Sequence, residues 1–129
     1  MLMLLRTTAV VAALAAAVLT SVGTASASPE AASACKVASS AKELGSTVDP
    51  KSNLRASPRL NGTIECTTDR KLGMGIDCWT HGDFFNDGQT ATDVWYHGYV
   101  GWENPFGYVW GGNVNTTQDP PPGLKQCGT

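Results

Sequence analysis

The sequence contains little of what a catalytic or membrane-embedded protein requires. It has only two histidines, its four cysteines include no CxxC pair, and its basic residues form no cluster. No second long apolar run follows residues 9–19 that could serve as a membrane anchor. A chain of 129 residues is also too short for a multidomain enzyme.

The first 27 residues have the composition of a secretion signal. Arg6 supplies a positive charge, residues 9–19 form an apolar core, and Ala25-Ser26-Ala27 has small residues at the spacing that signal peptidase accepts. Cleavage after Ala27 would leave enough residues for one domain. The sequence therefore predicts a secreted, extracellular protein with a signal peptide at 1–27.

The charge balance bears on the choice of partner. The whole chain has a formal net charge of −2, and the only basic residue of the predicted signal is Arg6, so the mature chain is more negative. Nucleic acids and anionic lipids attract clustered basic surfaces. We therefore expect that the protein binds neither nucleic acid nor a membrane. We also expect a monomer.

The cysteines are best explained by two disulfides. Cys35, Cys66, Cys78 and Cys127 all follow the predicted signal, and an even number of cysteines in a small secreted chain indicates disulfide bonds. Zinc sites usually draw their ligands in close pairs, whereas these cysteines are widely spaced. We expect no metal and no cofactor.

The pairing depends on where the chain reverses. Residues 62–66 and 72–79 are typical of two strands, with the polar residues 67–70 as their turn. Such a hairpin separates Cys66 from Cys78 by roughly 20 Å, whereas a disulfide needs α-carbons within roughly 7 Å. This favours Cys35–Cys66 and Cys78–Cys127. If the chain reverses at 72–75 instead, Cys66 and Cys78 become neighbours.

The remaining chain has the pattern of a small all-β domain. Residues 28–45 are small and polar and predict a loosely ordered lead, and residues 46–129 alternate short apolar runs with turn residues. Fourteen glycines and seven prolines favour a tightly curved barrel over a flat sheet. Strands are expected near residue 48 and at 53–55, 62–66, 72–79, 93–102, 106–110 and 113–115. Residues 80–93 are expected to form a polar loop, and the proline-rich tail to run over the surface to Cys127.

Aromatic residues are concentrated in one part of the chain. All tryptophan, tyrosine and phenylalanine residues lie between Trp79 and Trp110, and those of 93–102 occupy both faces of the expected strand. A small barrel can use such rings simply to fill its core, or it can expose them to an extended peptide or to sugar rings. For the second case the candidate ligand-binding residues are Trp79, Trp95, Tyr99 and Trp102, with Asp93 and His97 as polar partners.

Several short motifs resemble those of bacterial SH3-like (SH3b) domains. Residues 53–58, Asn-Leu-Arg-Ala-Ser-Pro, resemble the N-[VL]-R-x-G-P opening of that family, and residues 106–116 resemble the closing motif of secreted actinobacterial SH3-like proteins. Residues 62–64 and 76–78 match two of its strands, and Trp95 matches a tryptophan near the start of the fourth. Ser57 stands where the family has glycine, and the loop after Pro58 is short. The similarity covers about residues 46–127.

The resemblance implies a fold and a class of function. It implies a partly open barrel of five to six short strands, stapled by disulfides, that is noncatalytic and binds cell-wall peptidoglycan peptides, such as a stem or a cross-bridge. Related secreted proteins carry a strand cysteine like Cys78 and a final one like Cys127, which favours that pair. A secreted inhibitor or another protein-interaction module is the alternative, with a secreted protein as its partner.

The residues offer only a weak case for catalysis. No serine lies in a nucleophile-elbow context, and the segment 80–88 lacks the alternating ligands and final glutamate of a calcium loop. Acids suited to glycoside hydrolysis, such as Asp83 and Glu103, lie in or beside polar segments where acids are ordinary. A small hydrolase that uses His81 or His97 with a loop acid is a third hypothesis.

Overall fold

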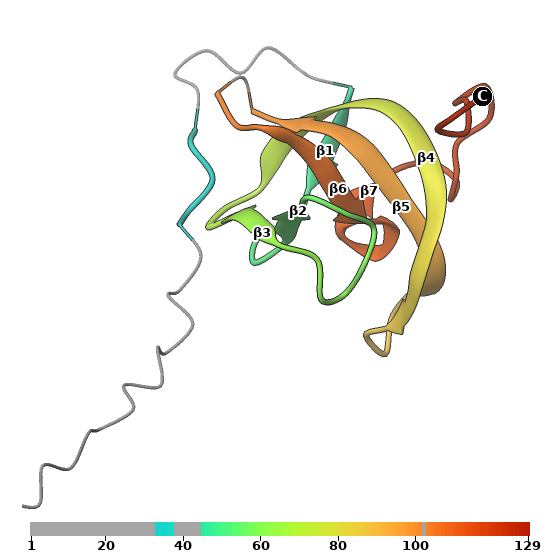
Figure 1. Cartoon of the computed structure of the whole chain (residues 1–129), viewed down its shortest axis with the longest axis horizontal. Helices are drawn as coiled ribbons and strands as arrows, with labels where there is room; N and C mark the ends of the chain where they lie inside the picture. Colours follow the sequence, from blue (N-terminus) through green and yellow to red (C-terminus); the bar gives the residue numbers. More distant parts are fainter. Residues whose placement is uncertain (1–32, 38–44, 102) are drawn as a thin grey trace, which may run out of the picture.

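The computed structural model describes residues 33–37, 45–101 and 103–129 (Figure 1). The predicted signal peptide, most of the predicted lead and Trp102 lie outside these residues. The described part contains no α-helix, and therefore no helix that is long and apolar enough to cross a membrane.

Within the described ranges, seven antiparallel strands form one curved sheet. They are β1 (Ser46–Val48), β2 (Asn53–Arg55), β3 (Ile64–Thr67), β4 (Leu72–Asn86), β5 (Ala91–Val100), β6 (Phe106–Trp110) and β7 (Val114–Asn115), with a short 3₁₀ turn, η1 (Gly111–Asn113), before β7. Their order is β3-β2-β6-β5-β4-β1-β7, and the two outer strands do not pair with each other. The structure confirms a disulfide-stapled, partly open all-β fold, with seven strands rather than five to six.

The longest strands form a hairpin where a polar loop was expected. β4 continues to Asn86 and β5 begins at Ala91, so the prediction of a loop over 80–93 is wrong. Two irregularities interrupt the β4–β5 register, one between Ile76 and Cys78 and one between His81 and Phe85. The first adds one residue to β4 and the second adds two, and these interruptions hide the strand from a period-two pattern. Figure 1 shows the hairpin as two long, curved ribbons.

The expected hairpin between residues 62–66 and 72–79 does not exist. β3 pairs with β2, with Cys66 opposite Leu54, whereas β4 lies between β5 and β1. The polar residues 68–71 therefore connect distant parts of the sheet instead of making a tight turn. A polar connection marks the end of a strand but does not say which strand is its neighbour.

Both predicted disulfides are present, although the hairpin from which they were argued is not. Cys35 is joined to Cys66 with α-carbons 4.8 Å apart, and Cys78 to Cys127 at 5.0 Å. The first ties residues 33–37 to β3, beside a parallel bridge between Ala34 and Thr67. The second ties the C-terminal tail to β4.

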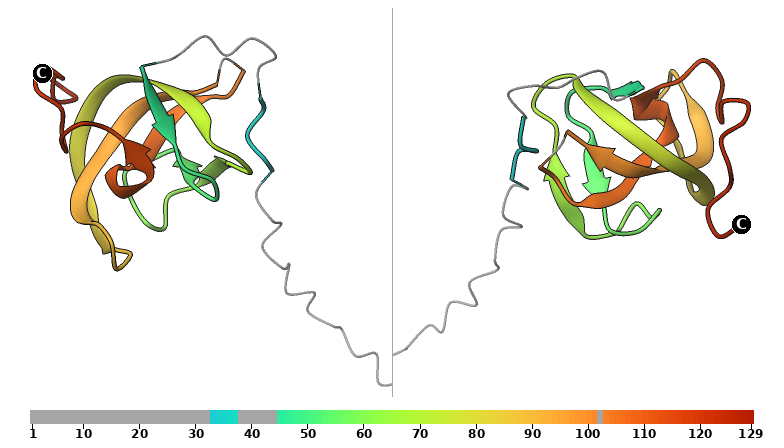
Figure 2. Two further views of the ribbon diagram at one scale, coloured as in Figure 1. Left: turned by 180° about the vertical axis from the view of Figure 1, so that it is seen from behind. Right: turned by 90° about the horizontal axis from the view of Figure 1, so that it is seen from above.

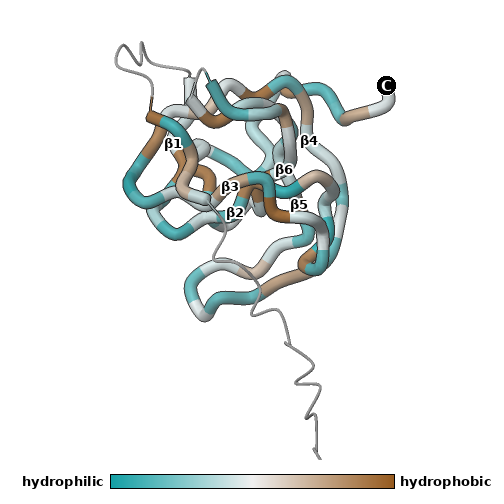
Figure 3. Tube along the Cα trace, turned by 60° about the vertical axis from the view of Figure 1, so that its left-hand side comes forward, coloured by the Kyte–Doolittle hydropathy of each residue, from teal (hydrophilic) through white to brown (hydrophobic). Residues whose placement is uncertain are grey.

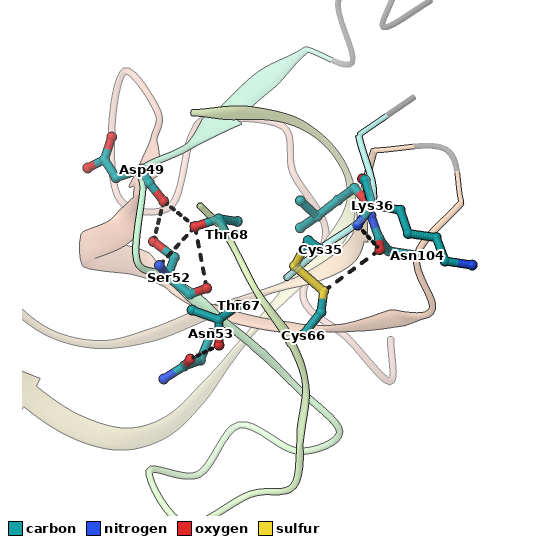
Figure 4. The surroundings of a disulfide bond; sticks show 10 residues. Cys35, Lys36, Asp49, Ser52, Asn53, Cys66, Thr67, Thr68 and Asn104 are labelled. Atoms are coloured by element: carbon teal, nitrogen blue, oxygen red, sulfur yellow. Dashed lines mark hydrogen bonds between the residues drawn. A yellow bond between two sulfur atoms is a disulfide. The ribbon is translucent and has the colours of Figure 1, made fainter. Parts of the chain in front are cut away.

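A network of buried hydroxyl groups fixes the turn between β1 and β2 (Figure 4). The side chains of Ser52 and Thr68 both donate to the carbonyl oxygen of Asp49 at 2.7 Å. The backbone N–H of Ser52 donates to the Thr68 hydroxyl at 2.9 Å. Within this turn Lys51 adopts the left-handed conformation, with φ of 63°.

The core lies on the concave face of the sheet. Its fully buried residues come from five strands: Val48, Leu54, Met74, Tyr96, Val100 and Val109. Apolar residues, brown in Figure 3, recur along the strands between hydrophilic turns. Burial, and then the hydrogen bond to Asp119, raises the pKa of Tyr96 well above its usual value. The Tyr96 hydroxyl therefore stays protonated and donates to Asp119, which holds the start of the tail.

Other segments cover the part of β4 that extends beyond β1. The tail runs beside β4 (Figure 2), where the N–H of Trp79 donates to the carbonyl of Lys125 at 3.1 Å. Farther along, the N–H of Asp83 donates to the carbonyl of Pro58 at 3.0 Å. Gly82 permits this approach, because a β-carbon there would lie 2.2 Å from the Pro58 oxygen. The loop at 57–61 is therefore held close to the hairpin.

Candidate functional site

The outer face of β5 and β6 carries paired rings. The register places Trp95 opposite Trp110, His97 opposite Tyr108, and Tyr99 opposite Phe106. Their neighbours along the strands, including Tyr96 and Val109, point into the core on the other face. We call these three pairs the ring row.

The ring row is buried at one end and exposed at the other. Trp95 and Trp110 expose only 1% and 5% of their surface, whereas Phe106 exposes 61%. The indole N–H of Trp95 donates to the carbonyl of Asp83 at 3.0 Å, and that of Trp110 to the carbonyl of Thr92, also at 3.0 Å. The expectation that Trp95 presents an exposed ring is wrong, because the hairpin and the 57–61 loop cover it.

A pocket opens at the buried end of the ring row. Its volume is about 450 Å³, within the size range of small-ligand sites. It lies between the segment 51–60, the hairpin and the turn that follows β6. Its walls consist of Lys51, Asn53, Arg55, Leu60, Phe85, Trp95, Trp110 and Asn113.

One wall of the pocket is apolar and open to solvent. Phe85 and Leu60 each expose 42% of their surface, and the Phe85 ring packs edge-on against Trp110 with centroids 5.1 Å apart. The buried residues Trp95 and Trp110 also line the pocket. Phe85 was missed by the sequence analysis because it lies in the segment expected to be a polar loop. The adjacent phenylalanines at 84 and 85 were the available signal.

The other wall is polar and carries two cations. Arg55 lies on β2, and one of its Nη atoms donates to the carbonyl of Gly62 at 2.8 Å. Lys51 comes from the turn before β2, and Asn53 lies between the two cations in sequence. Within the described residues, neither Lys51 nor Arg55 forms an ion pair. The wall therefore offers positive charge to a ligand.

The other predicted site residues lie away from this pocket. Trp79 is partly buried against the core, and its indole N–H donates to the carbonyl of Leu124 at 3.2 Å. Asp93 lies 3.1 Å from Nδ1 of His81. His97 and Tyr99 share the outer face with Trp95 but sit farther along the ring row. Of the predicted residues that the structure describes, the pocket contains only Trp95.

Both histidines are paired with aspartates. Nδ1 of His97 lies 2.7 Å from a carboxylate oxygen of Asp77, in the same arrangement as His81 and Asp93. A hydrolase built on such a pair needs a nucleophile within reach of the ring. In the described ranges no serine, threonine or thiol hydrogen-bonds to either imidazole.

One group of possible metal ligands is disabled by a disulfide. Ligand atoms of Asp77, Cys78 and His97 lie within 4.8 Å of one another. The sulfur of Cys78 is bonded to that of Cys127, so it cannot act as a thiolate ligand. Two potential ligands remain, which are fewer than the three that a catalytic zinc site uses.

Comparisons with known proteins add no family assignment. No family model, no curated protein and no solved structure matches the chain. The function is therefore inferred from the geometry of the pocket and from the residues that line it.

Proposed function

We propose that the protein is a secreted, noncatalytic binding module that holds an extended peptide in the pocket at the end of the ring row. The observation that carries the proposal is the mixed lining of the pocket. The exposed side chains of Phe85 and Leu60 are apolar, whereas those of Lys51, Asn53, Arg55 and Asn113 are polar or charged. Ligand pockets combine apolar area with a few convergent polar groups.

An extended peptide suits both walls at once. Successive side chains of an extended chain point in opposite directions, so one can lie against Phe85 while its neighbour faces Arg55. The amides of Asn53 and Asn113 can donate to or accept from the peptide main chain. The buried indoles give a rigid floor, which limits the entropy lost on binding.

The proposed location and ligand class rest on the sequence. The predicted signal peptide and the two disulfides support an oxidising, extracellular environment. The resemblance to SH3-like domains supports a cell-wall peptide, such as a peptidoglycan stem or cross-bridge, as the ligand.

Replacing Phe85 by alanine is expected to weaken binding to purified peptidoglycan about tenfold, because a few large side chains at the centre of a binding site supply most of the binding energy. The melting temperature is expected to change little, since 42% of the side chain is already exposed. Binding isotherms on insoluble peptidoglycan measure the first quantity and thermal unfolding the second.

Phe84 provides the matched control. It is adjacent to Phe85 and 64% exposed, but it does not line the pocket. Phe84→Ala is therefore expected to bind like the wild type. Equal loss of binding in the two variants, or no loss in either, would contradict the proposed site.

A second candidate function is supported by Phe84 itself. This ring is exposed near the end of a hairpin, where a partner protein can contact it without any peptide in the pocket. The protein would then be a secreted inhibitor or interaction protein. Purification from culture medium separates the two functions, because a stoichiometric protein partner that Phe84→Ala releases is expected only for the second.

A further inference from the structure

We infer that the pocket selects peptides in which an acidic group lies beside an apolar side chain. The inference rests on the proposed function and names the class of peptide that the same site accepts. Three features carry it: two unpaired cations on one wall, the preset geometry of Arg55, and the backbone conformation of Lys51.

In the part of the chain that the structure describes, the cations of the pocket form no ion pair with an acidic side chain. No aspartate or glutamate is among the residues that line the pocket. The nearby Asp83 carboxylate accepts the backbone N–H of Leu60 at 2.9 Å and lies 3.3 Å from Arg59. Asp49 accepts the side-chain amide of Asn115 at 2.9 Å. A carboxylate of the ligand is the complementary group that the pocket itself does not supply.

Arg55 is preset to receive a carboxylate. Its hydrogen bond to the carbonyl of Gly62 restricts the side chain and uses one of its five N–H donors. The remaining donors lie in a planar fork that matches the two oxygens of a carboxylate. Because the side chain is already held, less entropy is lost when the ligand binds.

Lys51 occupies a backbone conformation that favours glycine or asparagine. Its φ of 63° lies in the left-handed region, where a lysine side chain is disfavoured. The hydroxyl network of Ser52 and Thr68 (Figure 4) holds this turn in place. The Lys51 N–H also donates to the Thr68 carbonyl at 2.7 Å. Such conformations cluster at binding sites, and here the strained residue is one of those that line the pocket.

The apolar residues of the pocket determine that the ligand also needs an apolar side chain. Phe85 and Leu60 line the same pocket as the two cations and contribute its exposed apolar surface. A ligand with an acidic group alone would leave these side chains in contact with water. A ligand with both groups, on adjacent residues of an extended chain, contacts both walls.

Selection from a library of randomised heptapeptides tests the inference with the mature protein as bait. Wild type is expected to enrich peptides with aspartate or glutamate beside an apolar residue. Lys51→Gln is expected to bind the selected peptides at least tenfold more weakly, and amidation of their carboxyl groups is expected to weaken wild-type binding to the same extent. Lys71→Gln removes an equal charge from an exposed residue outside the pocket and is expected to bind like the wild type.

A second variant separates charge from folding. Lys51→Gly is expected to raise the melting temperature or leave it unchanged, since glycine adopts positive φ freely, and yet to lose as much affinity as Lys51→Gln. Unchanged affinity in both Lys51 variants would overturn the inference.

The outcomes also separate this inference from the proposed function. Peptides that are selected without acidic enrichment, and that Phe85→Ala still releases, would overturn the acidic preference and leave peptide binding in place. A library that yields no peptide dependent on Phe85 would overturn both.

Discussion

Replacing Trp95 by alanine is expected to lower the free energy of unfolding by about 3–5 kcal/mol, the usual cost of removing a buried aromatic side chain. Trp95 is 1% exposed and donates to the carbonyl of Asp83, so its removal leaves a cavity and an unpaired carbonyl. A domain of this size has a total stability of about 5–15 kcal/mol. Denaturation by urea, followed by circular dichroism, measures the change.

The matched control is Trp95→Phe, which keeps a ring at the position and loses the indole N–H. We expect it to cost less than the alanine variant, because most of the packed volume remains. A loss below about 1 kcal/mol for Trp95→Ala would show that the ring lies on the surface, since exposed positions tolerate substitution at that level.

The expected instability of Trp95→Ala makes this variant unsuitable for identifying residues that contact the ligand. A variant that is largely unfolded fails to bind any ligand, so loss of binding by Trp95→Ala does not identify a contact. Phe85 lines the same pocket and is half exposed, so its removal reports on binding more directly.

Removing the Cys78–Cys127 disulfide by a double alanine substitution is expected to lower the free energy of unfolding by about 4 kcal/mol. The bond closes a loop with a sequence separation of 49, and the entropy of closing such a loop in the unfolded chain gives a value of that order. The tail residues at 125–127 then pair with β4 only through backbone hydrogen bonds. Urea denaturation of wild type and variant provides the measurement.

The tail supplies an independent readout. Its release uncovers Trp79, whose indole donates to the carbonyl of Leu124, so quenching of tryptophan fluorescence by acrylamide is expected to increase. Folded material should still bind peptide, because the tail does not line the pocket. Unchanged stability and unchanged quenching would show that the tail is held without the disulfide.

The short strands were predictable because their patterns are local. β2 and β6 match their expected residues, since each is a brief alternating run between turn residues. The strand predicted at 72–79 ends earlier than β4 does, because the bulges of β4 break the alternation on which the prediction rests. The predicted pairing of β3 with β4 was wrong, since β3 pairs with β2. The neighbour of a strand depends on packing over the whole sheet, and a local sequence pattern does not contain that information.

The candidate site was only partly predictable for the same reason. Alternation placed Trp95, His97 and Tyr99 on one face, and the structure confirms that they share it. It could not show that the 57–61 loop and the hairpin bury Trp95 while leaving Phe85 open. The conformation of Lys51 depends on the distant residue Thr68, so the sequence around the turn does not reveal it.

The resemblance to SH3-like domains stays a prediction. Its opening motif includes Arg55, and its matched tryptophan is Trp95, both of which line the pocket. The all-β architecture agrees with the fold that the resemblance implies.

The most direct test of the account is to locate bound peptide by NMR. Soluble stem peptides released from peptidoglycan are titrated into ¹⁵N-labelled mature protein, and backbone and indole N–H shifts are followed. We predict that the largest changes occur at Lys51, Phe85 and the indoles of Trp95 and Trp110, with little change at Trp79. Changes centred on Phe106 and Tyr99 at the exposed end of the ring row, or no changes at all, would contradict a peptide site in the pocket.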